Sequence, residues 1–280
     1  MWQSSYDGSP VLYLVSTPIG NLDDITYRAV KILEEVEVIF SEDTRVTQNL
    51  LNHFGIKKKL IALHDHNEET VKSKVLDYLK KGYSIALVTD RGTPIISDPG
   101  YKSVKYVSDM GYNVVAIPGV CAFVPALIVS GIAPQPFTFY GFLNSKESRR
   151  KKELESLKFV KNTMIFYEAP HRIKETMELM LEVFDDREVS LSREISKKFE
   201  SVYRGNISTL LPTLDGIKGE FVIVVAGSNI EEDNRTLSVI DNVKLYIENG
   251  MSSMDAIKRV SRERGIPKSE VYATYHKDVK

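Results

Sequence analysis

VLYLVSTPIGNLDDIT (residues 11–26) decides the fold, together with TDRGTPIISDPG (residues 89–100). In each case a β-branched hydrophobic strand runs into a loop of Gly, Pro, Asn or Asp, and a helical pattern follows. Open α/β sheets bind their ligands beyond the carboxyl ends of parallel strands, where such loops converge over a crevice. Two loops of this kind within the first hundred residues indicate an α/β enzyme.

The first loop excludes a dinucleotide-binding fingerprint. That motif requires glycines in the pattern G-x-G-x-x-G. Here Ser16, Thr17 and Pro18 occupy the tight turn, and Gly20 is its only glycine.

Composition sets wide bounds on the function. The 280 residues are 42% hydrophobic and 27% charged, which is ordinary for a globular protein, and two domains fit in this length. The net charge of −1 provides no global attraction to nucleic acid, so RNA binding must use local patches.

Cysteine and histidine usage gives no metal site. Cys121 is the only cysteine, which excludes an internal disulfide and a cysteine zinc site. The pair His64 and His66 around Asp65 is the one hint of a metal, and we interpret it as a solvated loop. We therefore expect no metal.

Residues 114–134 contain no charged side chain and in this respect resemble a membrane-spanning segment. This run holds prolines and glycines whose backbone a lipid-exposed helix could not satisfy, so we interpret it as a buried strand, a turn and a buried helix. Residues 1–10 lack the basic start and apolar core of a signal peptide. We expect a cytoplasmic protein.

The first 117 residues alternate between strands and helices. Helical patterns end on Gly55, Gly82 and Gly111, each followed by a strand. This alternation predicts βαβ units and a mainly parallel sheet. The predicted strands lie near residues 11–15, 36–40, 60–63, 84–88 and 113–117, and the predicted helices near 26–35, 44–54, 68–81 and 99–110.

Beyond Pro118 the pattern changes, and we predict a second α/β domain. Strands are expected near residues 137–141, 163–167, 188–193, 200–204 and 220–226. Several are joined by short turns, which favours a partly antiparallel sheet. Residues 228–236 are polar and acidic and are interpreted as a linker. The predicted domains are residues 1–117, 118–228 and 236–280.

The C-terminal segment predicts a helical pair. Ser252 and Asp255 resemble a capping box, Gly265 breaks the helix, and Pro267 can open another. This pair, with its basic residues, is either a helix-turn-helix or a small appendage with a solvated basic face.

Five segments at predicted strand ends carry polar and charged residues: STPIGN (16–21), SEDTR (41–45), DRGTPIISDPG (90–100), PGVCA (118–122) and YEAPHR (167–172). A single such loop is usually an ordinary turn. Five on one chain favour a functional site.

These segments, with GEFVIVV (219–225), resemble the tetrapyrrole methylase superfamily and, within it, the ribosomal RNA small subunit methyltransferase I family, the cytidine 2′-O-methyltransferases. The resemblance covers nearly the whole chain. It implies an α/β fold in which a parallel Rossmann-like sheet and a mixed second sheet enclose S-adenosylmethionine, a small C-terminal helical domain, and a homodimer. It also implies methylation of a cytidine ribose in 16S rRNA, with the small ribosomal subunit as the expected partner.

The resemblance assigns residues to the cofactor. GTP (92–94) matches the family's G-D-P turn, and PGVCA matches its P-G-P-S-A. Tyr167 should line the other side of the cleft. The implied cofactor-binding residues are Thr93, Pro94, Ile96, Pro118, Cys121, Ala122 and Tyr167. Two departures stand out, since Arg91 replaces a small residue and Cys121 replaces a serine.

A ribose hydroxyl titrates well above neutral pH, so its methylation benefits from a base or a strongly aligned acceptor. Carboxylates and a histidine near strand ends are candidates, Glu168 among them. The STPIGN loop lies where relatives face the methyl acceptor. The predicted catalytic set is Glu42, Asp43, Arg45, His171 and Asn21. Glu42 and Asp43 have an alternative role as caps of the helix opening at Thr44.

Positive charge near the site predicts the RNA contacts. The run KESRRKK (146–152) follows the aromatic stretch FTFYGF (137–142) and suits single-stranded RNA, although it is equally typical of a solvated helix start. The predicted RNA-binding residues are Arg91, Arg149, Arg150, Arg172 and Arg193. Arg204 is a further candidate phosphate clamp.

Two other functions stay open. A protein of the same fold could methylate a corrin or porphyrin precursor, or it could bind the ribosome without catalysis. EDTR, YEAPHR and the C-terminal helices favour the RNA methyltransferase over the first, and binding of the methyl donor would argue against the second.

Overall fold

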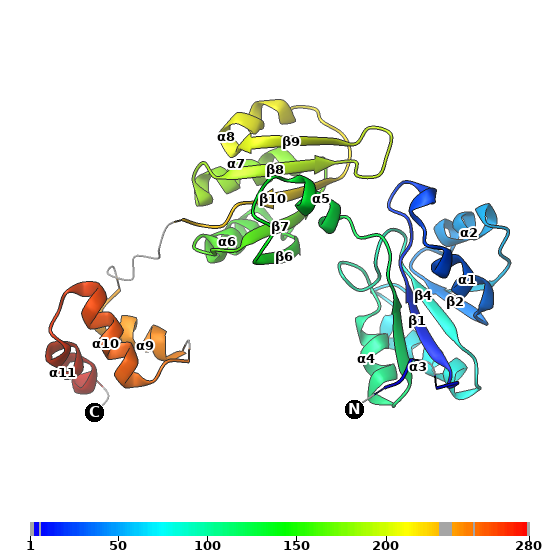
Figure 1. The fold of residues 1–280 in the computed structure, drawn as a ribbon, viewed down its shortest axis with the longest axis horizontal. Coiled ribbons are helices and arrows are strands. Elements are labelled where there is room, and N and C mark those ends of the chain that lie inside the picture. Colours follow the sequence, from blue (N-terminus) through cyan, green and yellow to red (C-terminus); the bar gives the residue numbers. More distant parts are fainter. Residues whose placement is uncertain (1–2, 6, 230–236, 249, 279–280) are drawn as a thin grey trace. The chain divides into compact units, whose positions relative to one another are not determined.

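The computed structural model describes residues 3–5, 7–229, 237–248 and 250–278 (Figure 1). The chain divides into two compact units, one ending at Ser228 and one beginning at Asn229. The predicted boundary at residues 117/118 lies inside the first unit and stays a prediction, as do the other domain limits. Most of the predicted linker, residues 230–236, lies outside the described residues.

The first sheet of unit 1 is wholly parallel and has the strand order β3-β2-β4-β1-β5. Its central strand pairs with both neighbours, so that Leu14 lies opposite Leu87 on one side and Ala116 on the other. The strands are β1 (Val11–Val15), β2 (Val38–Ser41), β3 (Lys59–Ala62), β4 (Ile85–Val88) and β5 (Asn113–Ile117).

Helices cover both faces of this sheet, as a parallel sheet requires. Val11 and Val15 face α1 and α2, whereas Leu12 faces α3 and α4, because side chains alternate along a strand. Figure 1 shows the two helix pairs on either side of β1, β2 and β4. The helices are α1 (Tyr27–Glu35), α2 (Thr44–His53), α3 (Glu68–Lys80) and α4 (Tyr101–Asp109), with a short 3-10 helix, η1 (Leu22–Asp24), after β1.

The second sheet is mixed and has the order β6-β7-β10-β8-β9. Only β6 and β7 run parallel, and the other three pairs are antiparallel. The strands are β6 (Phe137–Phe142), β7 (Thr163–Glu168), β8 (Glu188–Arg193), β9 (Ser201–Asn206) and β10 (Phe221–Val225).

The faces of this second sheet also bury different residues. Ile165, Val222 and Val224 pack against α5 (Phe123–Val129), and the other face packs a larger cluster around Phe166. That cluster is covered by α6 (Glu147–Leu157), α7 (Ile173–Phe184), α8 (Ile207–Leu210) and η2 (Leu211–Leu214). Tyr167 and Phe166 therefore point to opposite faces of β7.

The predicted α/β fold, with a parallel sheet followed by a mixed one, is confirmed. Every predicted strand and helix of the first 117 residues exists, with ends displaced by at most two residues. The segments that form α7, α8 and η2 were not assigned a structure from the sequence.

Unit 2 contains α9 (Val239–Glu248), α10 (Ser253–Arg264) and α11 (Lys268–Asp278). The predicted helix ends are confirmed, because the Ser252 side chain accepts a hydrogen bond from the Asp255 amide and Gly265 has φ of 64°. The expected helical pair corresponds to α10 and α11, and α9 adds a third helix. Among the described residues, no helix is long and apolar enough to cross a membrane.

Candidate active site

Three loops at the carboxyl ends of neighbouring strands are joined by hydrogen bonds. Thr17, after β1, and Gly92, after β4, exchange both backbone hydrogen bonds at 2.9 Å. The Thr93 hydroxyl donates to the carbonyl oxygen of Val120, after β5, at 2.9 Å and lies 3.0 Å from the Ser16 hydroxyl. The loops after β1, β4 and β5 are thus held as one surface.

The close packing of these loops constrains the chain at two positions. A Cβ on Gly119 would lie 2.6 Å from the Cβ of Ser16, so only glycine fits there. Ile95 has φ of 78°, which is unfavourable for a β-branched residue and is the kind of strain found at functional sites.

The joined loops form one wall of a cavity of about 380 Å³. The ends of β6 and β7, the loop after β7, the start of β10 and the β8–β9 connection supply the rest. This volume is within the range of small-molecule sites, roughly 300–1,000 Å³. Five of the seven predicted cofactor-binding residues line the cavity: Thr93, Ile96, Cys121, Ala122 and Tyr167.

Pro94 and Pro118 are not among the residues that line this cavity. Pro94 is buried behind Thr93, and Pro118 is exposed. The assignment of all seven residues to the cofactor stays a prediction.

The Tyr167 ring is fixed by other aromatic rings. Phe139 and Phe142 contact it edge-on, with ring centroids 5.0 and 5.4 Å away. Burial, and then the neighbouring Cys121, raise the pKa of the Tyr167 hydroxyl, so it stays protonated and can donate a hydrogen bond. Burial likewise raises the pKa of the Cys121 thiol, which favours a neutral group there.

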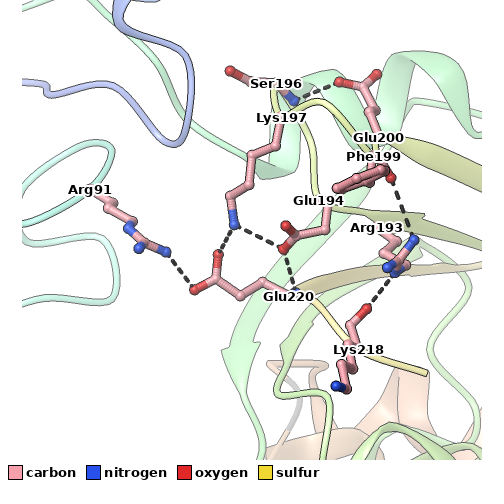
Figure 2. A network of polar contacts seen from close by, with 9 residues as sticks. All are labelled: Arg91, Arg193, Glu194, Ser196, Lys197, Phe199, Glu200, Lys218 and Glu220. Carbon is pink, nitrogen blue, oxygen red and sulfur yellow. Dashed lines mark hydrogen bonds and ion pairs between the residues drawn. The ribbon is translucent and has the colours of Figure 1, made fainter. Parts of the chain in front are cut away.

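A polar network lies beside the cavity (Figure 2). Glu220 accepts from Arg91 at 2.8 Å and from Lys197 at 2.7 Å, and Lys197 also donates to Glu194 at 2.9 Å. Arg91 belongs to the loop after β4, whereas the other three belong to the second sheet and its connections. The network therefore ties the two halves of unit 1 together next to the cavity.

The β8–β9 connection in this network reaches the first loop as well. A Cβ on Gly20 would overlap the Lys197 side chain, and the Ser196 hydroxyl donates to Asp24. Glu194 and Ser196 have φ of 52° and 71°, so the connection is strained where it borders the cavity. The sequence prediction missed this connection, because its residues follow no recognisable motif.

Several carboxylates lie close together at the carboxyl ends of β2 and β4. Glu42 accepts from the Thr89 hydroxyl at 2.9 Å, and Asp90 accepts from the Asp43 amide at 3.0 Å. Burial and then the Glu42 charge raise the pKa of Asp98 to about 6. Burial is also the main cause that raises the pKa of Asp90.

Asp43 and Arg45 stabilise the start of α2. Asp43 is the N-cap residue and accepts from the Arg45 amide at 2.8 Å, which is the alternative role that the sequence left open. The Arg45 guanidinium donates to both Asp43 oxygens at 3.0 and 2.6 Å and holds the pKa of that carboxyl at about 2. A carboxyl with so low a pKa is a weak base.

Asn21 and His171 lie on exposed loops. The Asn21 side chain accepts from the Asp23 amide and caps η1. His171 follows β7 in the YEAPHR segment and is exposed. None of the five predicted catalytic residues is among those described as lining the cavity, and their roles stay predictions.

Glu168 is buried and fully bonded, although it borders the cavity. It accepts from the Arg172 side chain, the Ala169 amide and the Thr176 hydroxyl, at 2.9, 2.8 and 2.6 Å. This arrangement fixes the loop after β7 and engages both carboxylate oxygens in hydrogen bonds.

The predicted RNA-binding arginines have different environments. Arg149 is exposed on α6, and Arg91 is paired with Glu220. Arg193 donates to the carbonyl oxygens of Lys218 and Phe199, as Figure 2 shows, and Arg172 is held by Glu168. Arg204, at the other end of the hairpin, donates to a carbonyl oxygen.

The structure corrects the expectation for Arg150. Its side chain is 1% exposed and pairs with Glu175 at 3.1 Å, because this face of α6 packs on α7. A side chain so buried is not available to RNA, whereas Arg149, the preceding residue on the helix, is exposed.

A second cavity, of about 260 Å³, lies on the other side of the Thr17–Gly92 bridge. Leu22, Val46 and Asp90 are among its lining residues, and Arg91 borders both cavities. In the described part of the chain, no group of three or more metal-ligating side chains is found.

Comparison with known proteins identifies the fold family. The sequence matches the family described as Tetrapyrrole (Corrin/Porphyrin) Methylases over residues 11–211. The chain belongs to the tetrapyrrole methylase family. The matched region includes the whole first sheet and β6 to β9 of the second, and it ends before β10.

Two relatives that align over nearly their whole length share one name. Ribosomal RNA small subunit methyltransferase I of Bacillus subtilis is 48% identical over 98% of both chains. The protein of that name from Halalkalibacterium halodurans is 44% identical over 99% of both chains.

Solved tetrapyrrole methylases have the same fold. Uroporphyrin-III-C-methyltransferase from Thermus thermophilus gives a TM-score of 0.55 at 20% identity, covering 77% of this chain and 94% of that one. A cobalt precorrin-4 methyltransferase gives 0.57 at 18% identity, with the same coverage. At such identity the likeness supports the fold alone.

Tetrapyrrole methylases use S-adenosylmethionine as methyl donor. The large cavity fits this cationic molecule in size and chemistry. Tyr167 and Phe142 offer aromatic surface, Thr93 offers a hydroxyl, and Asp98 offers negative charge toward a sulfonium.

Proposed function

We propose that this protein, in the cytoplasm, methylates the 2′-oxygen of a cytidine ribose in 16S rRNA within the small ribosomal subunit. The observation that carries the proposal is the 48% identity over 98% of both chains to a ribosomal RNA small subunit methyltransferase I. A match of this length includes all five loop segments and unit 2, so the likeness goes beyond the shared fold.

The chain's own part in this reaction is to hold two reactants in line. S-adenosylmethionine supplies an activated methyl group when bound. Thr93, Ala122 and Tyr167 would hold the donor in the large cavity, and the aromatic wall would keep water away. The segments STPIGN, EDTR and YEAPHR would hold the ribose, since near-attack positioning supplies much of the acceleration in group transfer.

RNA capture would use local positive charge, because the net charge is only −1. Lys146, Arg149 and Lys152 are exposed along α6 and its start, where they can approach phosphates without disrupting the core. Such contacts weaken with salt.

A homodimer is proposed as the active form. The support within unit 1 is an apolar surface on α5, where Val124 and Ile128 are 45% and 72% exposed, near the exposed Phe137. Exposed apolar patches of this kind mark interaction sites. Ile128→Asp should shift the sedimentation profile toward monomer, and an unchanged profile would place the contact elsewhere.

Methyl transfer from labelled S-adenosylmethionine tests the function directly. Small subunits and naked 16S rRNA from a strain lacking the enzyme are offered in parallel, and the labelled nucleotide is mapped by mass. Ribose methylation is expected to make the following bond resistant to alkali. A label on the base, or transfer to a precorrin-type acceptor only, would contradict the proposal.

Truncation after Asn234 tests the part played by unit 2. The shortened protein should stay folded and bind S-adenosylmethionine, because unit 1 ends at Ser228 and has its own cores. Methylation should become less efficient because the RNA binds more weakly, so KM should rise by a larger factor than kcat falls. An insoluble product would show that unit 2 completes the core.

A further inference from the structure

The second cavity, of about 260 Å³, is lined by loops of the first sheet and by α2. Its walls come from the loop after β1, from the start of η1, from one face of α2 and from the residues directly after β4. None of the seven residues assigned to the methyl donor is among the described residues that line it. Sites for drug-sized ligands span roughly 300–1,000 Å³, so this smaller cavity suits a ligand with a single ring.

A single backbone segment separates this cavity from the large one. Pro18 and Gly20 line the second cavity, whereas Ile19 between them lines the large cavity. The bridge between Thr17 and Gly92, with both backbone hydrogen bonds at 2.9 Å, holds this segment in place. A nucleotide can therefore place its base in the second cavity while its ribose stays beside the large one.

Apolar side chains open to solvent line one part of the second cavity. Leu22 and Val46 are each 40% exposed, and η1, which begins at Leu22, buries none of its residues. Leu50 lies one turn beyond Val46 on the same face of α2 and is half-buried. Exposed apolar side chains around a hollow are typical of a binding site, and they suit the flat face of a base.

Two polar side chains of α2 line the same cavity without a hydrogen bond in the described part of the chain. Thr47 is only 3% exposed, and Asn49, two residues further on, is exposed. The Thr17 hydroxyl, by contrast, donates to the carbonyl oxygen of Thr89 at 3.1 Å. Since buried polar groups normally have a partner, the Thr47 hydroxyl indicates a ligand that bonds to it from the cavity.

We propose that the second cavity binds the base of the target nucleotide, a cytosine turned out of the RNA. The ring lies against Leu22 and Val46, and the Asn49 amide faces its pairing edge. The amide oxygen can accept from the exocyclic amine of cytosine, and the amide nitrogen can donate to its ring nitrogen. Enzymes that act on an extruded base read it through such apolar contacts and hydrogen bonds. The inference rests on the proposed transfer to a cytidine ribose.

A phosphate group is a less suitable occupant of this cavity. Among the described lining residues, Arg91 is the only cation, and its guanidinium is paired with Glu220. Asp90 places a carboxylate in the same wall, which repels an anion. The uncharged ring of a base fits this lining better than the sugar–phosphate backbone does.

The first experiment compares Val46→Trp with Asn52→Trp, an exposed position on another face of α2. Val46→Trp should fill the cavity and lower kcat/KM for small subunits by roughly 10-fold to 100-fold, the loss expected when one stacked base is displaced. The calorimetric Kd for S-adenosylmethionine should stay within a few-fold of wild type in both variants, and Asn52→Trp should methylate like wild type. A loss of donor affinity that accounts for the whole loss of transfer would overturn the proposal.

Asn49→Leu tests the hydrogen bonds to the base. It removes the donor and the acceptor at similar size, so kcat/KM should fall by about 10-fold or more. The melting temperature should not change, because Asn49 is exposed and has no hydrogen bond to lose in the described structure. Asn52→Leu is the matched control, since Asn52 pairs only with Gln48 on the surface. If Asn49→Leu methylates like wild type, the base is not read there and the proposal is wrong.

Ultraviolet crosslinking locates the base independently of turnover. Wild-type protein with S-adenosylhomocysteine is irradiated on unmethylated small subunits, and the peptide–nucleotide adducts are identified by mass spectrometry. The nucleotide that the wild type methylates should be attached to residues 17–22 or 46–50. Attachment of that nucleotide to the β8–β9 connection, residues 194–200, would place the base on the other side of the loop and overturn the proposal.

Failure of this inference can be told from failure of the proposed function. If wild-type protein transfers no methyl to RNA, the function is wrong whatever the second cavity binds. If wild type methylates RNA and Val46→Trp stays within a few-fold of it, the function stands and the second cavity is not the site of the base.

Discussion

Ala122→Trp is expected to abolish the binding of S-adenosylmethionine, taking calorimetric heats to the level of buffer. Ala122 lines the large cavity just before α5 and belongs to the same apolar cluster as Tyr167. An indole there would fill the space that the adenosine requires, and a well-packed wall cannot move aside cheaply. The direct measurement is titration of the donor into the purified variant.

The matched control is Ala273→Trp, which places the same side chain on an exposed face of α11. It should bind the donor like wild type. Circular dichroism must show that Ala122→Trp keeps its secondary structure, since α5 also packs on the second sheet. A folded Ala122→Trp variant with normal affinity would show that the donor binds elsewhere.

The sequence allowed the loops of the site to be predicted because their chemistry is local. Thr93, Cys121 and Tyr167 each follow a strand whose hydrophobic pattern is clear, and parallel strands bring their carboxyl ends to one edge. The cavity that joins them also requires the second sheet, whose strands and mixed character are predicted but whose strand order is not. Mixed pairing depends on long-range contacts that no local pattern specifies.

Burial of charged residues could not be predicted from the local pattern. Arg149 and Arg150 are adjacent in one basic run, yet the helix turns one outward and buries the other against α7. Asp98 lay within a recognised segment, but its neighbours Glu42 and Asp90 come from other strand ends. The altered pKa of Asp98 therefore exists only in the folded chain.

The strained connection between β8 and β9 could not be predicted from the sequence either. Lys197 crosses over Gly20 and pairs with Glu220, so three distant segments meet beside the cavity. The positive φ angles of Glu194 and Ser196 go against the preference of those residues. Local propensity fails where tertiary contacts overrule it, which is expected at a functional site.

Glu168→Ala should destabilise the fold by about 3–5 kcal/mol, the cost of removing one partner from a buried ion pair. The Glu168 side chain is fully buried and the Arg172 side chain is 15% exposed, with 2.6 Å between their charged atoms. The substitution would also leave the Ala169 amide and the Thr176 hydroxyl without their acceptor. Urea denaturation followed by circular dichroism measures the loss.

Glu182→Ala is the surface control, because Glu182 is 56% exposed and pairs with Lys151 on α6. Exposed pairs contribute about 1 kcal/mol or less, so this variant should unfold close to wild type. Adding Arg172→Ala to Glu168→Ala should recover part of the loss, because it removes the uncompensated guanidinium. If Glu168→Ala unfolds like wild type but is inactive, Glu168 takes part in the chemistry. If it loses stability as expected, a loss of activity reflects a loosened loop after β7, because the Ala169 amide and the Thr176 hydroxyl have lost their acceptor.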